Sequence, residues 1–312
     1  MKLQIFNFSL LVVGTPVENL ITCNVPDGKP SSIPQDCQVC LDTIVVTNDK
    51  STWPAKELAL QKIKTLSIQA DLPRFLQIPL QVETLEIRRY ISNGTEFPTI
   101  SAENLFLDNL RRKTITFKDI KPTVLKISNS EVAIYGIASE DLQLLSIDKS
   151  TITDTELRDL TSADIINIAH STISPQYLLP KLNETHSINI HHSSIVKVNF
   201  PVAKVTGNIN IEENRYISSI EFHNLETVLG DLLIENFRDI PTIKLPHLQQ
   251  IQAIEVHTKT IAIDLPSSVK WTGKSYFENT TSLENYAHLR AQGLGFGVGI
   301  QYKTRCFNKL EI

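Results

Sequence analysis

The sequence predicts a mainly β protein, a right-handed parallel β-solenoid of about ten rungs with a C-terminal capping helix. Two observations predict this fold. A short pattern of two apolar residues around one variable residue recurs along most of the chain at a nearly constant interval. A Ser or Asn residue follows that pattern at the same distance in consecutive repeats. A constant interval of about twenty residues indicates a solenoid, in which each repeat forms one rung.

The apolar pairs form the centre of each predicted strand. First members of successive pairs are 19 to 23 residues apart. Because side chains alternate between the two faces of a strand, both members of a pair point to one side, which we expect to be the core. One rung cannot bury its own apolar face, so stacked rungs make the core continuous. The ten pairs are Leu66/Ile68, Leu85/Ile87, Leu105/Leu107, Leu125/Ile127, Leu145/Ile147, Ile166/Ile168, Ile188/Ile190, Ile209/Ile211, Leu232/Ile234 and Ile254/Val256.

The Ser or Asn position marks the point where the chain turns out of each strand. A short polar side chain can hydrogen-bond the backbone of such a turn, and we expect neighbouring rungs to repeat the bond as a ladder. Shortly after it an apolar residue returns to the core. The polar residues are Ser130, Ser150, Ser171, Ser193 and Asn214, and the apolar residues are Val132, Ile152, Ile173, Ile195 and Ile217.

The two ends of the chain differ from the repeats. Residues 1–15, with Lys2 before a short apolar run, predict a secretory signal peptide, and a buried first strand is the alternative. We predict an N-terminal cap containing disulfides over residues 16–58, the solenoid over 59–270 and a C-terminal cap over 271–312. Within the last segment, TSLENYAHLRAQG predicts a helix from about residue 282 to 292 and GFGVGIQYK predicts a final strand.

The cysteines and glycosylation sequons are consistent with an extracellular protein. An even number of cysteines in a secreted chain predicts disulfides, here two, although four cysteines allow three pairings. The one Cys-x-x-Cys spacing has neither a second such pair nor a βαβ pattern beside it, which argues against a zinc or redox site. The cysteines are Cys23, Cys37, Cys40 and Cys306, and the sequons begin at Asn93, Asn183 and Asn279.

Composition excludes some classes of partner. The net charge is −4 at pH 7, so we do not expect the protein to bind nucleic acid. Apart from the N-terminus, no stretch approaches the roughly 18 apolar residues of a membrane span, and we expect no transmembrane segment. The tail CFNKLEI lacks the hydrophobic stretch of a lipid-anchor signal. Together with the predicted signal peptide, these features predict a secreted, extracellular protein.

The repeat resembles the leucine-rich repeat L-x-x-L-x-L-x-x-N-x-L, with Ser mostly in place of Asn. Residues 205–256 are more specifically similar to the receptor L-domain, the β-solenoid of insulin- and EGF-receptor ectodomains. GNINI (207–211) and GDLLI (230–234) resemble paired rungs of that family, and FHNLE (222–226) and LPHLQ (245–249) resemble its links. Small secreted L-domain proteins of similar layout are known in nematodes. The chain has no long cysteine-rich module, membrane span or kinase, which argues against a direct signalling role.

The adjacent histidines in SINIHHSSI raise the question of a metal site. His192 has the same place in its repeat as His170 one rung earlier and Glu213 one rung later. Rungs are about 4.8 Å apart, and imidazoles suit zinc or copper. A closed zinc site usually needs four ligands, whereas the next rungs offer Lys149 and Asn236. We therefore expect solvated rim residues, with no metal and no cofactor.

The outward columns of the predicted sheet form a candidate binding surface. Solenoids commonly bind partners along such an extended face, and we predict an extracellular protein or peptide ligand. A merely solvated sheet would carry a similar composition. The predicted binding residues are Asn167, Asn189, His191, Asn210, Glu212, Glu235 and Glu255.

Two other functions have sequence features in their favour. Polysaccharide lyases and hydrolases built as parallel β-helices share the rung period and need converging acidic residues, which Asp148, Glu212 and Glu235 could supply. No motif singles out a pair of them, and the Gly-rich stretch at 293–299 lacks the Lys of a phosphate-binding loop. We therefore predict no enzyme. A glycan-active or glycan-binding β-helix and a structural extracellular surface component are the alternatives.

Overall fold

The computed structural model describes most of the chain between residues 21 and 277. The described residues are 21–26, 28–47, 61–69, 80–89, 91, 94–97, 100–155, 157, 159–173, 179–236, 238–257, 260–266, 268–273 and 275–277. The predicted signal peptide, C-terminal helix and final strand lie outside them, as do Asn93, Asn279 and Cys306.

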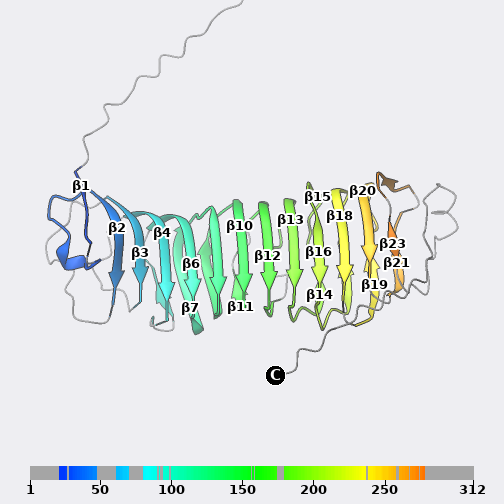
Figure 1. The fold of residues 1–312 in the computed structure, drawn as a ribbon, viewed down its shortest axis with the longest axis horizontal. Helices are drawn as coiled ribbons and strands as arrows, with labels where there is room; N and C mark the ends of the chain where they lie inside the picture. The colour runs from blue at the N-terminus through cyan, green and yellow to red at the C-terminus, as the bar shows by residue number, and fades with distance from the viewer. Residues whose placement is uncertain are drawn as a thin grey trace, which may run out of the picture.

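The chain forms a parallel β-solenoid of about ten turns (Figure 1). Its largest sheet has fifteen strands arranged along the long axis, and every pairing in it is parallel. Both β15 and β16 pair with β13 and β18, and both β22 and β23 pair with β20, so each of these two pairs of strands shares one turn. The chain must return to the same end before each parallel strand, so each repeat makes one turn. The strands are β1 (Thr22–Cys23), β2 (Val39–Val46), β3 (Lys62–Ile68), β4 (Leu80–Arg88), β6 (Ile100–Asp108), β8 (Val124–Ser128), β10 (Asp141–Asp148), β12 (Ser162–Ala169), β13 (Glu184–His191), β15 (Lys204–Val205), β16 (Ile209–Glu212), β18 (Thr227–Glu235), β20 (Gln250–Val256), β22 (Lys270–Trp271) and β23 (Tyr276–Phe277).

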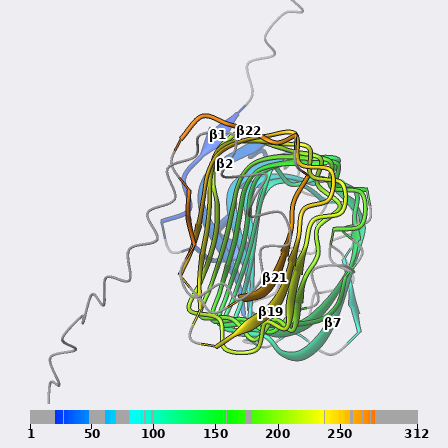
Figure 2. The same ribbon diagram turned by 90° about the vertical axis from the view of Figure 1, so that its right-hand side faces the viewer.

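Two sheets of four strands each are built from the returning segments. Seen along the long axis, β7, β19 and β21 lie across the core from the strands of the large sheet (Figure 2). The first small sheet contains β5 (Thr95–Glu96), β7 (Arg111–Ile120), β9 (Glu131–Ile137) and β11 (Thr151–Thr155), and the second contains β14 (Lys197–Val198), β17 (Ser219–Glu221), β19 (Ile240–Lys244) and β21 (Thr260–Asp264).

Helical structure is sparse in the described part of the chain. It comprises the short 3-10 helix η1 (Pro30–Ser32), which follows β1. No helix among the described residues has the length and hydrophobicity needed to cross a lipid bilayer.

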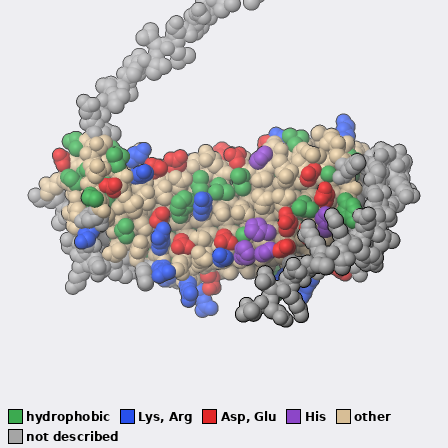
Figure 3. Space-filling view, viewed as in Figure 1, with side chains coloured by type: hydrophobic (Ala, Val, Ile, Leu, Met, Phe, Trp, Pro, Cys, Tyr) green, Lys and Arg blue, Asp and Glu red, His purple; other side chains and the backbone are tan. Residues whose placement is uncertain are grey.

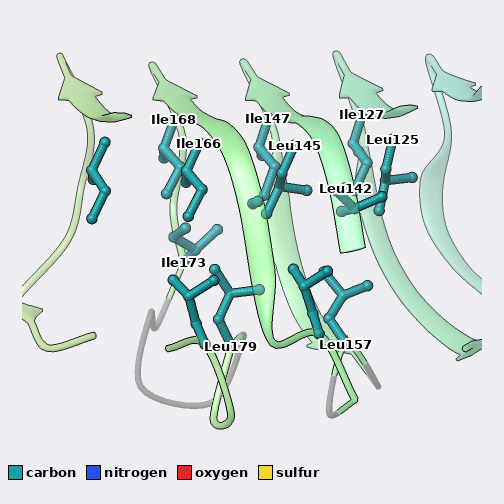
Figure 4. Close-up of a cluster of buried hydrophobic side chains, with 14 of the residues drawn as sticks. Leu125, Ile127, Leu142, Leu145, Ile147, Leu157, Ile166, Ile168, Ile173 and Leu179 are labelled. Atoms are coloured by element: carbon teal, nitrogen blue, oxygen red, sulfur yellow. The ribbon is translucent and has the colours of Figure 1, made fainter. Parts of the chain in front are cut away.

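All ten predicted apolar pairs are buried and stacked in register. For example, Leu145 pairs with Ile166 and Ile147 with Ile168, and all four side chains are fully buried. Figure 4 shows these residues in rows across neighbouring strands, with Leu157 from a returning segment in the same cluster. The predicted alternation is therefore confirmed.

An eleventh apolar pair precedes the ten that the repeat predicted. Ile44 and Val46 on β2 pair with Leu66 and Ile68 on β3, and both are buried. Both β1 and β2 lie in the segment 16–58, so the large sheet begins inside the predicted N-terminal cap.

The predicted Ser and Asn ladder is present and buried. The hydroxyl of each Ser accepts a hydrogen bond from the backbone N–H of the corresponding residue in the preceding rung, as from Ser130 to Ser150 and from Ser150 to Ser171, each at 3.1 Å. Asn214 takes the same role for Ser193 through its Oδ1 atom, at 2.8 Å. Each rung is thus tied to the next at the turn, where strand pairing has ended.

The residue before each ladder position has a left-handed backbone. His170, His192 and Glu213 have φ values of 49°, 53° and 54°, a region that non-glycine residues seldom adopt outside turns. The same conformation occurs at Asn109, Asn129 and Lys149. These residues turn the chain out of the strand, and this turn sets the positions of His170 and His192.

The N-terminal segment contains one disulfide bond, between Cys23 and Cys37. Cys40 lies on β2 as a buried thiol that forms no disulfide within the described residues, and burial is the main cause that raises its pKa. The other predicted disulfide cysteine, Cys306, is outside the described residues, so the second disulfide stays a prediction.

Candidate functional site

A row of polar side chains crosses the outer face of the large sheet. Its members are register partners on five consecutive strands, from β8 to β16. Strands about 4.8 Å apart give the row a length of about 19 Å. Near one end, the Nδ2 atom of Asn210 donates a hydrogen bond to Oδ1 of Asn189 at 2.9 Å. The row consists of Lys126, Ser146, Asn167, Asn189 and Asn210.

This row lines a shallow groove of about 490 Å³. Leu144 and Ile165, which are register partners, line it toward the amino ends of the strands. His191 and Glu212, also register partners, line it toward the carboxyl ends. The groove therefore has an apolar flank, an amide-rich floor and a flank that can carry charge.

Five of the seven predicted binding residues come together in this groove: Asn167, Asn189, His191, Asn210 and Glu212. The other two lie in later rungs. Glu235 is the register partner of Glu212 on β18, and Glu255 on β20 has its carboxylate 3.5 Å from Nε2 of His257. Neither Glu235 nor Glu255 lines the groove.

Five lining residues were not among the predicted binding residues, and one of them, Ile190, is a predicted core residue. Lys126 and Ser146 have the same place in the repeat as Asn189, so extending the Asn column by two rungs would have found them. Leu144 and Ile165 are apolar residues at an outward position. Their outward position could have been predicted from the L-x-x-L spacing, because the two residues between the buried positions of that pattern lie outside the core.

Three histidine rings meet beside the groove. The ring centroids of His170 and His192 are 5.0 Å apart, and His191 lies 5.7 Å from the former and 5.8 Å from the latter. The space-filling view shows a group of His side chains at the carboxyl ends of the strands, with acidic and basic groups nearby (Figure 3). The three histidines thus form one cluster at the carboxyl ends of β12 and β13.

Carboxylates contact two of the three rings. Nδ1 of His170 is 3.1 Å from Oδ1 of Asp148, and Nε2 of His192 is 2.9 Å from Oε2 of Glu213. The side chains of both histidines are 44% exposed. No group of three or more potential metal ligands in the described part of the chain is arranged to hold an ion.

The pKa of His191 is lowered. Burial is the largest cause, followed by the neighbouring rings of His192 and His170, and the negative charges of Glu212 and Asp148 act in the opposite direction. A neutral imidazole offers one donor and one acceptor, so His191 can take either role toward a ligand in the groove.

A second hollow of about 420 Å³ lies at the turn on the other side of the histidine cluster. Its lining includes His170, His192 and Glu213 together with Arg215 and Tyr216. The Tyr216 ring lies 5.8 Å from the guanidinium carbon of Arg238 and is half-exposed. His191 lines the first hollow, whereas its neighbours His170 and His192 line the second.

The acidic residues weighed for glycan chemistry are only partly brought together. Glu212 and Glu235 are neighbours on adjacent strands. Asp148 is in the same cross-strand row as Glu212 but three strands away, which is about 14 Å at the usual strand spacing. Of these three acidic residues, only Glu212 and Glu235 are therefore close enough to act as a pair.

No protein-family model, curated protein or solved structure matches the chain. The similarity to the receptor L-domain therefore rests on the repeat pattern and on the parallel solenoid that this pattern forms.

Proposed function

We propose that this protein is a secreted, glycosylated, non-catalytic binding protein of the receptor L-domain type, which captures an extracellular protein or peptide through the groove on its large sheet. The observation that carries the proposal is the meeting of five predicted binding residues in one groove of about 490 Å³. Its amide floor, apolar flank and ionisable flank suit a peptide, because the peptide backbone, an apolar side chain and a charged side chain can each contact a different part of the groove.

The ordered face of the solenoid supports this proposal. The Ser and Asn ladder ties each rung to the next at the turns, and Asn189 and Asn210 are themselves joined across strands. A preorganised face loses little conformational entropy on binding. The groove is also lined by residues of the large sheet and not by long loops.

Selection of peptides tests the binding role. Random 12-residue peptides displayed on phage would be selected on the immobilised wild-type protein, after depletion on a variant in which Asn189→Trp fills the groove. We expect wild-type protein to enrich peptides that the variant does not bind, with equal melting temperatures for both. Failure to enrich any such peptide would contradict peptide capture by this groove.

Expression in a secretory host tests the compartment. We expect removal of about the first fifteen residues and glycans on one or more of Asn93, Asn183 and Asn279; Asn183 is exposed. Mass spectrometry with and without reduction should show the Cys23–Cys37 disulfide and would test whether Cys40 and Cys306 form a second one. An unglycosylated full-length chain retained in the cytosol would contradict secretion.

A second candidate function, binding or cleavage of a glycan, is favoured by the pairing of Glu212 with Glu235. Retaining glycoside hydrolases hold two carboxyl groups about 5 Å apart, and adjacent strands provide a similar spacing. Cleavage of any member of a polysaccharide panel by wild-type protein, with loss of cleavage in Glu235→Gln, would favour this candidate over the first.

A further inference from the structure

We propose that the groove binds an extended peptide segment of about six residues, acidic at one end and basic at the other, which lies across the strands of the large sheet. This inference rests on the proposed function, because it specifies the ligand of the same groove. It follows from three features of the groove: the charges at its ends, its length and the order of its side chains.

The two ends of the groove carry opposite charges that the protein does not neutralise. Lys126 on β8 is exposed, and its ammonium group lies 5.2 Å from the centre of the Phe106 ring. Glu212 stands at the β16 end. Within the described residues, neither side chain forms an ion pair. Complementary charges across an interface favour one partner and one register, so we expect an acidic group near Lys126 and a basic group near Glu212.

The length of the groove sets the length of the peptide. Four strand spacings of about 4.8 Å separate β8 from β16, a distance of about 19 Å. An extended chain advances about 3.3 Å per residue, so about six residues span the two ends. A shorter peptide could reach only one of the charged residues.

The side chains between the ends predict the order of the ligand residues. Ile165 is 39% exposed and Leu144 is its register partner, so an apolar ligand side chain belongs on β10 and β12, nearer Lys126. Toward Glu212 the floor consists of Asn amides, and the amide of Asn167 makes no hydrogen bond within the described residues. These amides can bond the backbone N–H and C=O groups of an extended segment.

The same lining argues against a glycan in this groove. None of the described residues that line it is Trp, Tyr or Phe. Sugar rings bury their apolar faces against flat aromatic side chains, and the one ring here is the imidazole of His191. The apolar surface comes instead from branched aliphatic side chains, which suit a Leu, Ile or Val side chain of a peptide.

Charge reversal tests the inference. Peptides enriched from the random 12-residue phage library would be synthesised with a fluorophore and titrated by fluorescence polarisation. We expect them to share an acidic and a basic residue about five positions apart, with an apolar residue nearer the acidic one. Lys126→Glu and Glu212→Lys should each weaken binding at least tenfold. A peptide with the matching charge reversed should recover most of the affinity for each variant.

Matched controls separate a local effect from a general one. Lys118→Glu on β7 and Glu96→Lys on β5 make the same charge changes at exposed positions of a small sheet and should alter affinity less than twofold. All variants should keep the wild-type melting temperature.

The outcomes distinguish this inference from the proposed function. Enriched peptides could bind the groove with an affinity that neither charge reversal changes. The inference of a charge-matched ligand would then be wrong, whereas the proposed peptide-binding function would stand. If no peptide is enriched, or if the Asn189→Trp variant binds every selected peptide as well as wild type does, both the proposed function and the charge-matched ligand are wrong. Binding to a neutral oligosaccharide array in place of peptides would overturn the peptide class.

Discussion

The backbone N–H of Ser171 donates a hydrogen bond to the Oγ atom of Ser193, one rung further along the solenoid, at 3.1 Å. The hydroxyl of Ser193 in turn donates to the carbonyl oxygen of His191 at 3.0 Å. Both serine side chains are almost completely buried. One small hydroxyl therefore satisfies a backbone donor and a backbone acceptor at the turn, directly beside the histidine cluster.

We expect Ser193→Ala to destabilise the fold by about 1–3 kcal/mol, because the buried N–H of Ser171 would lose its acceptor. Urea unfolding followed by circular dichroism measures the loss. Ser187→Ala on the same repeat is the control. Its partly exposed side chain lies on the outer face of β13, so the change should stay within about 0.5 kcal/mol. Equal losses in the two variants would contradict the ladder's role.

Neighbouring residues on β13 should respond differently to truncation. Ile190 is fully buried, and Ile190→Ala should cost about 2–4 kcal/mol through lost burial and a cavity. Asn189 faces outward, and Asn189→Ala should change stability by no more than about 0.5 kcal/mol. Chemical denaturation of the two variants checks the strand register, and similar losses would mean that the register is wrong.

Two glycines with the same backbone conformation should tolerate a methyl group to different extents. Gly136 and Gly94 both have φ of 74°. A Cβ at Gly136 would lie 1.9 Å from the carbonyl oxygen of Phe117, whereas nothing lies within 4 Å of one at Gly94. Gly94→Ala should cost about 1–2 kcal/mol from backbone strain alone, and Gly136→Ala at least about 1–3 kcal/mol more from the clash. Thermal unfolding would show the difference, and equal stability of the two variants would contradict the close packing of β9 on β7.

Acidification should reduce stability through His191. Because its pKa is lower in the folded protein than the ordinary value of about 6.5, the unfolded chain takes up the proton first as the pH falls. Stability therefore declines below about pH 6.5 and levels off once the pH is below the folded pKa. Melting temperatures at several pH values between 8 and 5 should fall less for His191→Gln than for wild type.

His186→Gln is the control for this pH effect, since His186 lies near the other end of β13 and bonds Thr206 at 3.0 Å. It should keep the wild-type pH dependence. If His191→Gln and wild type lose stability in parallel, His191 does not carry the effect.

Much of the rung could be predicted because each of its features is local. The alternation around Ile188 and Ile190 marks a strand with one buried face, and Ser193 follows at the turn. The pair Ile44 and Val46 was not predicted because it lies in the cysteine-containing segment before the regular repeat, on a strand whose pairing with β3 shifts register between Cys40 and Thr43. The strands of the small sheets were missed because the returning segments vary in length and lack a constant alternating pattern.

The parallel solenoid, the buried pairs and the Ser ladder could be predicted from the sequence, because strand periodicity and the hydrogen-bonding needs of a turn depend on residues a few positions apart. Which outward side chains share the groove became clear only from the three-dimensional fold. Lys126 and Glu212 line the same groove, whereas Glu235, which has the same position in its repeat as Glu212, does not. The physical reason is that a groove depends on the register and curvature of several rungs together. The same holds for the histidines: His170 is about one rung from His191 and His192, and only the stacking of β12 on β13 brings the three rings into contact.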